Sequence, residues 1–116
     1  MPTKTMKSTA ERLAAAREVV SDPRVWLRRY LAKDKRGHWV FPPSPEAVQF
    51  CSLGAFVQET GDAVQAWREW TKHVDPVAME MYGRSAVAVN NHRSHGCVLK
   101  MLDAAVKRMR ENETPA

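Results

Sequence analysis

The sharpest constraint on the fold is a set of helix-start signals, of which Ser44-Pro45-Glu46 is the clearest. A serine can cap a helix, a proline suits the first helical position because its missing N–H costs nothing, and a glutamate complements the positive end of the helix dipole. We therefore predict a helix over residues 45–59. It is apolar over much of its circumference and is expected to be central and buried, with Gly54 allowing a neighbouring backbone to approach closely.

Similar signals predict helices at both ends of the chain. Ser8-Thr9-Ala10-Glu11 has the form of a capping box, so a helix is expected over residues 9–20, ending before Asp22-Pro23. Near the other end, Ser94 can cap a helix whose apolar residues follow the i, i+3, i+4 rule, namely Val98, Leu99, Leu102, Val106 and Met109.

Two further helices are expected between these. Asp62 can cap a helix whose apolar stripe includes Trp67 and Trp70, and Asp75-Pro76 can start another. The apolar run 86–89 is expected to be a short buried segment, and the polar residues that follow it are expected to form a loop.

Residues 24–41 carry a different pattern. Asp34-Lys35-Arg36-Gly37 is a turn signal flanked by apolar and aromatic residues, which favours a β-hairpin with Gly37 at a positive φ. A short helical turn is expected before the hairpin, and Pro42-Pro43 favours an extended connection after it. Together the signals predict an α+β fold, mostly α, with about four to five helices and one short β-hairpin.

A chain of 116 residues with 44% hydrophobic residues is expected to fold as one domain. We predict a flexible N-terminus over residues 1–7, a globular domain over 8–110 and a disordered tail over 111–116. The apolar runs are too short to cross a bilayer, and the N-terminus lacks the apolar stretch of a signal peptide. A cytoplasmic protein without membrane contact is therefore expected.

Positive charge is concentrated in the first third of the chain. Residues 1–40 contain ten Lys and Arg and four acidic residues, a net charge of +6, whereas the rest carries eight basic and nine acidic residues, a net charge of −1. Such a field attracts polyanions, including nucleic acids and acidic protein surfaces, although it also favours solubility alone. Within residues 24–41 rings and cations interleave, as they do in single-strand binding platforms.

Two blocks of the sequence resemble a family of small uncharacterised bacterial and phage proteins. The first block is Phe50-Cys51-Ser52-Leu53-Gly54-Ala55-Phe56, and the second contains Asn90-Asn91, Ser94 and Val98-Leu99-Lys100-Met101-Leu102-Asp103. The family pattern is an aromatic-Cys-x-x-Gly-Ala helix followed by Asn-Asp, Thr and a Val-Leu-x-x-Leu-Asp helix. The chain differs from it at Asn91, at Ser94 and at Gly96-Cys97, where a helix-favouring pair is usual. The resemblance implies a phage or prophage setting and supplies no mechanism.

Catalytic and metal-binding motifs are weak. His92, His95 and Cys97, with Cys51 approaching from the central helix, are the candidates for a zinc site, but their spacing is not one that zinc sites use. Cys97 in the first turn of a helix could be a thiolate nucleophile, yet no orienting acid or oxyanion-hole motif accompanies it. We therefore predict free thiols, no cofactor, no metal and no enzymatic activity.

The sequence thus predicts a small non-enzymatic protein that binds a macromolecule. The favoured partner is an acidic surface of a host protein, bound by a phage- or prophage-encoded chain that modulates a host process. The alternative is a nucleic acid bound by residues 24–41. The tryptophans could equally be ordinary core residues. The residues expected to contact the partner are Arg28, Arg29, Lys33, Lys35, Arg36, Trp39, Trp67 and Trp70.

Overall fold

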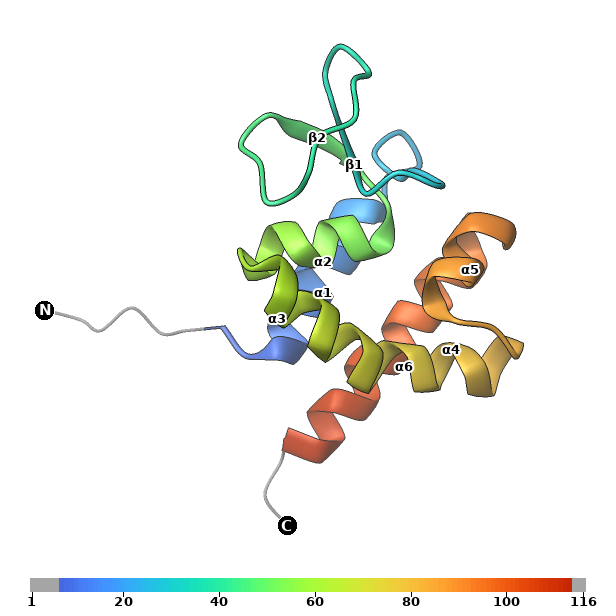
Figure 1. Cartoon of the computed structure of the whole chain (residues 1–116). Coiled ribbons are helices and arrows are strands. Elements are labelled where there is room, and N and C mark those ends of the chain that lie inside the picture. The colour runs from blue at the N-terminus through green and yellow to red at the C-terminus, as the bar shows by residue number, and fades with distance from the viewer. Residues whose placement is uncertain (1–6, 114–116) are drawn as a thin grey trace, which may run out of the picture.

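A computed structural model describes residues 7–113, in which helices pack around one core and a small β-sheet lies at one end (Figure 1). In chain order the elements are α1 (Thr9–Val20), β1 (Ala32–Asp34), β2 (Ala47–Phe50), α2 (Ser52–Thr60), α3 (Ala63–Glu69), the π-helical turn η1 (Trp70–Val74), α4 (Asp75–Tyr82), α5 (Ala86–His92) and α6 (His95–Glu113). Because α3, η1 and α4 are continuous, the described residues form five helical rods and one two-stranded antiparallel sheet. The expected α+β class, mostly α, is confirmed.

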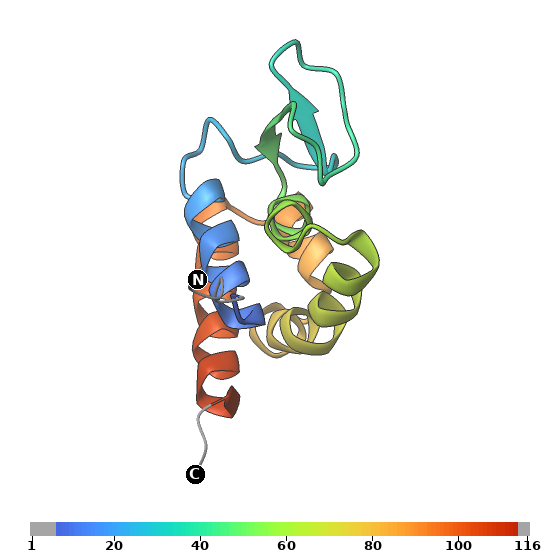
Figure 2. The same ribbon diagram turned by 90° about the vertical axis from the view of Figure 1, so that its left-hand side faces the viewer.

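The first and last helices lie side by side along one face of the molecule (Figure 2). The capping box at Ser8 is present, with Glu11 N donating to Ser8 Oγ and Ser8 N donating to Glu11 Oε1, both at 3.1 Å. Arg17 of α1 donates two hydrogen bonds, of 2.8 and 3.2 Å, to the carboxylate of Asp103 on α6. Ser94 Oγ accepts from Cys97 N at 3.2 Å, which confirms the predicted cap of α6.

The predicted ends of the domain differ from the observed ones at one side. Helix α6 continues to Glu113, so residues 111–113, which were expected in the tail, are helical. Most of the expected flexible ends, residues 1–6 and 114–116, lie outside the described residues.

The prediction of one helix over residues 45–59 is wrong in its first half. Ala47–Phe50 forms β2, which pairs with β1, and α2 begins only at Ser52 with Cys51 as its cap. Ser44 Oγ accepts from Glu46 N at 3.2 Å, so the expected cap closes a local turn and starts no helix. The second half of the prediction holds, since α2 is buried along most of its length.

At Gly54 of α2 two segments of backbone approach each other closely. A Cβ atom built on it would collide with the backbone carbonyl of Leu31, the residue that precedes β1. The Leu31 carbonyl also accepts from Cys51 N at 3.2 Å. The predicted close approach at Gly54 is therefore confirmed, and the backbone that lies there leads into the sheet. This contact holds the sheet against the N-terminal end of α2.

The hairpin signal is also confirmed. Gly37 has φ 82°, its N–H donates to the carbonyl of Asp34 at 3.0 Å, and Lys33 forms an antiparallel bridge with Trp39. The chain from residue 38 to 40 therefore lies beside β1, on the side away from β2. A short turn at residues 22–26 precedes the sheet, as expected.

The rod formed by α3, η1 and α4 contains a turn wider than that of an α-helix. Its buried residues Ala66, Trp70, Val74 and Ala78 recur every four positions, a spacing that drifts by about 40° per step around an α-helix. A π-helical turn takes up more residues and so keeps these side chains on one face. Trp70 can thereby point into the core, where its ring lies 6.0 Å from that of Phe56.

The prediction of a loop after residue 89 is wrong. Residues 90–92 belong to α5, which is capped by Ser85, whose Oγ accepts from Ala88 N at 3.3 Å. The polar side chain of Asn90 is 2% exposed because the fold gives it hydrogen-bond partners inside. Asn90 also lines a cavity, which is the candidate site.

Candidate functional site

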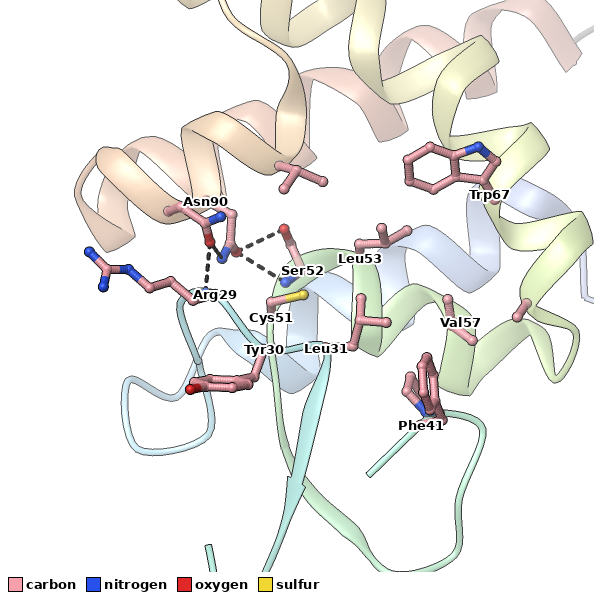
Figure 3. Close-up of a pocket in the computed structure, with 14 residues that line it drawn as sticks. Arg29, Tyr30, Leu31, Phe41, Cys51, Ser52, Leu53, Val57, Trp67 and Asn90 are labelled. Atoms are coloured by element: carbon pink, nitrogen blue, oxygen red, sulfur yellow. Dashed lines mark hydrogen bonds between the residues drawn. The ribbon is translucent and has the colours of Figure 1, made fainter. Parts of the chain in front are cut away.

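A cavity of about 370 Å³ opens between α2, α3, α5 and the residues on either side of the hairpin (Figure 3). We call it the aromatic cavity; it is lined by residues 29–31, 41–42, 51–53, 57, 63, 67, 87 and 90–91. These segments are far apart in the sequence, so the cavity exists only in the folded chain. Most of its wall is apolar.

The polar end of the cavity is built around Asn90 (Figure 3). Its Oδ1 atom accepts from Trp26 Nε1 at 2.8 Å, from Ser52 N at 3.1 Å and from Ser52 Oγ at 2.9 Å. Its Nδ2 atom donates to the carbonyl of Leu27 at 2.9 Å. One buried amide thus ties α5 to the start of α2 and to the segment before β1. Because both of its ends have partners, Asn90 holds the cavity together.

Asn91 fixes the backbone at the mouth of this polar end. Its Oδ1 atom accepts from Arg29 N at 2.8 Å, and Arg29 is in the left-handed region with φ 73°. A side chain other than glycine is uncommon there, and the hydrogen bond offsets the strain. The turn brings Arg29 and Tyr30 to the edge of the cavity.

Three exposed aromatic side chains border the cavity, and we call them the rim: Phe41 and Trp67 lie at its apolar end, and Tyr30 lies nearer Arg29. Tyr30, Phe41 and Trp67 are 47%, 69% and 53% exposed, yet each lines the cavity. Figure 3 shows Trp67, from α3, and Phe41, from the chain after the hairpin, beside the Leu53 and Val57 side chains of α2. Apolar rings left in water around a hollow are unusual for an isolated domain and typical of a binding surface.

A second hollow adjoins the cavity at Tyr30. It is lined by Tyr30, Lys33, Gly37, His38 and Trp39. The ammonium group of Lys33 lies 4.7 Å from the centre of the Tyr30 ring, and the Trp39 ring packs edge-on against that of Phe41 at 5.0 Å. The rim and the hairpin aromatics therefore form one continuous surface.

The charged side chains that line this surface are basic. Arg29 lines the cavity and Lys33 lines the adjoining hollow, whereas no aspartate or glutamate lines either of them. The Asp34 carboxylate lies outside both hollows, 3.9 Å from the ring of His38. A partner that places carboxylates beside its apolar contact would find two cations at this surface.

The structure gathers half of the residues predicted to contact a partner. Arg29, Lys33, Trp39 and Trp67 lie on this surface, as described above. Lys35 and Arg36 border a different hollow that also contains Asp34 and Glu46, so its charge is mixed.

Two of the predicted contact residues have structural roles. Arg28 donates to the carbonyl of Arg93 at 2.8 Å and lies 4.9 Å from the centre of the Trp26 ring, so it links the segment before β1 to the end of α5. Trp70 is fully buried, because the wide turn η1 directs it into the core. Trp70 is therefore removed from the predicted surface.

Sequence reasoning missed Phe41 and the two asparagines as parts of the site. Phe41 was visible as an aromatic residue next to Pro42-Pro43, but its place beside α2 depends on the sheet. Asn90 and Asn91 follow an apolar run directly, and a pair of amides at the end of such a run is the signal that could have identified a buried polar hub.

The residues considered for a zinc site have separate structural roles. Cys51 caps α2, its Sγ atom accepting from Gly54 N at 3.2 Å, and burial raises its pKa. Cys97 lies in the first turn of α6, where a hydrogen bond with Ser94 lowers its pKa. His95 Nε2 lies 2.6 Å from the Val20 carbonyl. Within residues 7–113 no group of three or more His, Cys, Asp or Glu could hold a metal ion.

Comparison with known proteins gives a family and no activity. The model of a family of unknown function, DUF6197, matches residues 4–108. Neither the curated proteins nor the solved structures contain a significant match. In the described part of the chain, no helix is both long enough and apolar enough to span a bilayer.

Proposed function

The chain belongs to the DUF6197 family, and we propose that it binds another protein through the aromatic cavity. An apolar side chain of the partner enters the cavity, and acidic residues beside that side chain pair with the surrounding cations. The observation that carries the proposal is the rim, in which Tyr30, Phe41 and Trp67 are largely exposed and yet line one apolar cavity.

Burial of the rim supplies the binding energy. Removing apolar surface from water contributes about 25 cal/mol per Å², and aromatic side chains carry large areas. Tryptophan, tyrosine and arginine are also the commonest anchors of protein interfaces. Because Leu53 and Val57 already shape the floor of the cavity, the partner would meet a site that is largely formed in advance, which lowers the ordering cost of binding.

The cations determine which partners are preferred. Arg29 and Lys33 are at the border of the cavity and face no acidic neighbour there. Charges of this kind act mainly on the rate of association and on the choice of partner. We therefore propose an acidic protein surface as the target.

The wider setting follows from the resemblance noted in the sequence. We propose a non-enzymatic protein of bacterial or phage origin that works in the cytoplasm of the host and modulates a host process by occupying this partner.

A nucleic acid is the second candidate, and one observation favours it. The hollow next to the cavity places Lys33 over the Tyr30 ring and Trp39 beside them, and bases stack on such surfaces while phosphates pair with the cations. The apolar cavity favours a protein partner, because an aliphatic or aromatic side chain matches its Leu31, Leu53 and Val57 lining, whereas a base would bury the polar atoms of its edge there.

Selection from a random peptide-display library, with the purified chain as bait, tests the proposal. The expected result is enrichment of peptides that combine an aromatic or aliphatic residue with Asp or Glu. Binding of the strongest peptide should weaken at least tenfold in Trp67→Ala and should also weaken as salt rises.

Met79→Ala is the matched control, because Met79 is also largely exposed but does not line the cavity. It should bind the peptide as the unaltered chain does. The proposal would be contradicted if no peptide were enriched while a single-stranded oligonucleotide, such as a 20-mer of thymidine, bound with an affinity that depended on Trp39.

A further inference from the structure

The small sheet has an open edge beside the aromatic cavity. Asp34 N donates to the His38 carbonyl at 2.9 Å and Val40 N donates to the Ala32 carbonyl at 3.0 Å. These two bonds flank the pair formed by Lys33 and Trp39. In an antiparallel ladder, a pair flanked in this way makes no hydrogen bonds of its own across the two strands. The N–H and C=O groups of Trp39 therefore point away from β1.

Phe41 continues this edge. Residues two apart in an extended strand face the same side, and the contact between the Trp39 and Phe41 rings at 5.0 Å shows that both side chains lie on one face. Within residues 7–113 neither the N–H group of Trp39 nor that of Phe41 has a hydrogen-bond partner. Pro42 has no N–H group, so the edge is short.

On the opposite side of the sheet, backbone hydrogen bonds cover the end of β2. The carbonyl of Phe50 accepts from Leu27 N at 2.8 Å, and Phe50 N donates to the Val25 carbonyl at 2.8 Å. The end of β2 is thus covered by the chain itself. At Trp39 the chain supplies no such cover within the described residues, and an uncovered strand edge is a template for pairing with another chain.

The open edge and the cavity share Phe41, whose side chain belongs to the rim. We infer that an extended acidic segment of the partner protein adds to the sheet as a strand beside Trp39 and Phe41. This inference rests on the proposed function and specifies the conformation of the bound partner. Main-chain hydrogen bonds to the edge fix the direction of the segment, and one apolar side chain on the face of the rim enters the cavity.

Charge complementarity gives the segment its composition. Side chains of the added strand alternate between the two faces. Lys33 pairs with Trp39 across the ladder and its ammonium group lies over the Tyr30 ring, so Lys33 is on the face of the rim. The position next to the anchor on that face is occupied by Asp or Glu. Because the edge ends at Pro42, about three residues of the segment pair with it.

Backbone methylation of the strongest peptide from the display selection tests this inference. A set of variants carries one N-methyl group each, at successive residues. In a strand, every second N–H group faces the neighbouring strand, so methylation should weaken binding at least tenfold at alternate residues around the anchor and should leave the residues between them unchanged. Amide exchange at Trp39 and Phe41, measured by NMR, should slow when the unmodified peptide binds.

Each other outcome overturns the inference in its own way. Binding of the peptide without alternation, and without protection of the Trp39 amide, would leave the proposed function standing and remove the added strand. Protection of Trp39 in the free protein that grows with its concentration would show a second copy of this chain at the edge. Protection by the thymidine 20-mer and not by the peptide would show a nucleic acid there. Failure to select any peptide would remove the proposed function and the inference together.

Discussion

The indole Nε1 atom of Trp26 donates a 2.8 Å hydrogen bond to the side-chain oxygen of Asn90, 64 residues further along the chain. That oxygen also accepts from the backbone and the hydroxyl of Ser52. Three donors therefore depend on one buried atom, and the free energy of unfolding depends on it in turn.

Asn90→Ala is expected to lower the free energy of unfolding by about 3 kcal/mol or more, because a buried polar group left without a partner costs about 1–3 kcal/mol. Urea denaturation measures the change. The control is Asn91→Ala, which removes the more exposed bond to Arg29 N and should cost about 1 kcal/mol. Equal effects of the two substitutions would show that Asn90 is not the hub described above.

Gly54→Ala is expected to destabilise the fold by about 3 kcal/mol or more, at the upper end of the cost of overpacking. The added methyl group collides with the Leu31 carbonyl, and a backbone atom that is held by Cys51 N cannot move aside easily. Gly96→Ala is the matched control, since its methyl group would lie 3.8 Å from Ser94 Oγ. Gly96→Ala should be neutral or stabilise the protein by up to about 1 kcal/mol. Thermal or urea unfolding of the two variants distinguishes the cost of the collision at Leu31 from the effect of alanine on helix propensity.

Trp67 and Trp70 are three positions apart, but their truncation to alanine should change the free energy of unfolding by very different amounts. Trp70→Ala empties a fully buried site and is expected to cost about 3–5 kcal/mol. Trp67→Ala should change the free energy of unfolding by no more than about 0.5 kcal/mol, because the ring is half exposed. Denaturation midpoints measure both. A large loss of stability in Trp67→Ala would mean that its ring supports the core, and its use as a test of binding would then fail.

The two thiols should react at different pH. The hydrogen bond from Ser94 lowers the pKa of Cys97, so alkylation by iodoacetamide is expected there first, and at lower pH than for a free cysteine. Ser94→Ala should move this reaction to higher pH. Cys51 is mostly buried and burial raises its pKa, so it should be labelled more slowly than Cys97, although it lines the aromatic cavity. Mass spectrometry of the labelled peptides identifies the site, and labelling of Cys51 before Cys97 would contradict these pKa directions.

The raised pKa of Cys51 also predicts how stability depends on pH. Burial favours the neutral thiol in the folded state, so its contribution is fully present below the pKa of the unfolded state, about 8.5. The contribution is lost as the pH rises through the folded-state pKa. The difference in free energy of unfolding between the unaltered chain and Cys51→Ala should therefore shrink above about pH 8.5.

The helix ends that the sequence predicted well are those fixed by local hydrogen bonds. The cap of α1 at Ser8 and that of α3 at Asp62 join atoms only three residues apart, so the signal and the structure occupy the same stretch of chain. The αL residue Gly61, with φ 78°, ends α2 for the same kind of local reason.

Elements that depend on distant partners were not predictable in this way. The strand Ala47–Phe50 follows a strong helix-start signal, and only pairing with β1 makes it a strand. Ser44 itself is held from a distance, because Gln58 Nε2 donates to its carbonyl and its N–H donates to Gln58 Oε1, both at 2.8 Å. Long-range contacts overrode the local preference here.

Only part of the candidate site could be predicted from the sequence, because the rest depends on contacts between distant segments. Charge and aromatic content are properties of the sequence, so Arg29, Lys33 and Trp39 could be named from it. The cavity is a property of the fold, since Phe41 and Asn90 meet there only after the sheet and α5 have packed on α2.

The wide turn η1 determines which changes of length this helical rod tolerates. A π-helical turn takes up one residue more than an α-helical turn over nearly the same rotation. Removing one residue at Thr71 or Lys72 would therefore leave an uninterrupted α-helix in which Trp67 keeps nearly the same orientation relative to α4. One further residue inserted there would rotate α3 by about 100° relative to α4 and would carry Trp67 away from the cavity. The hairpin tip at Lys35 and Arg36 is exposed and can gain or lose residues without moving Trp67. Among relatives of this chain, insertions and deletions should therefore accumulate at the tip, whereas η1 should lose a single residue and should not gain one.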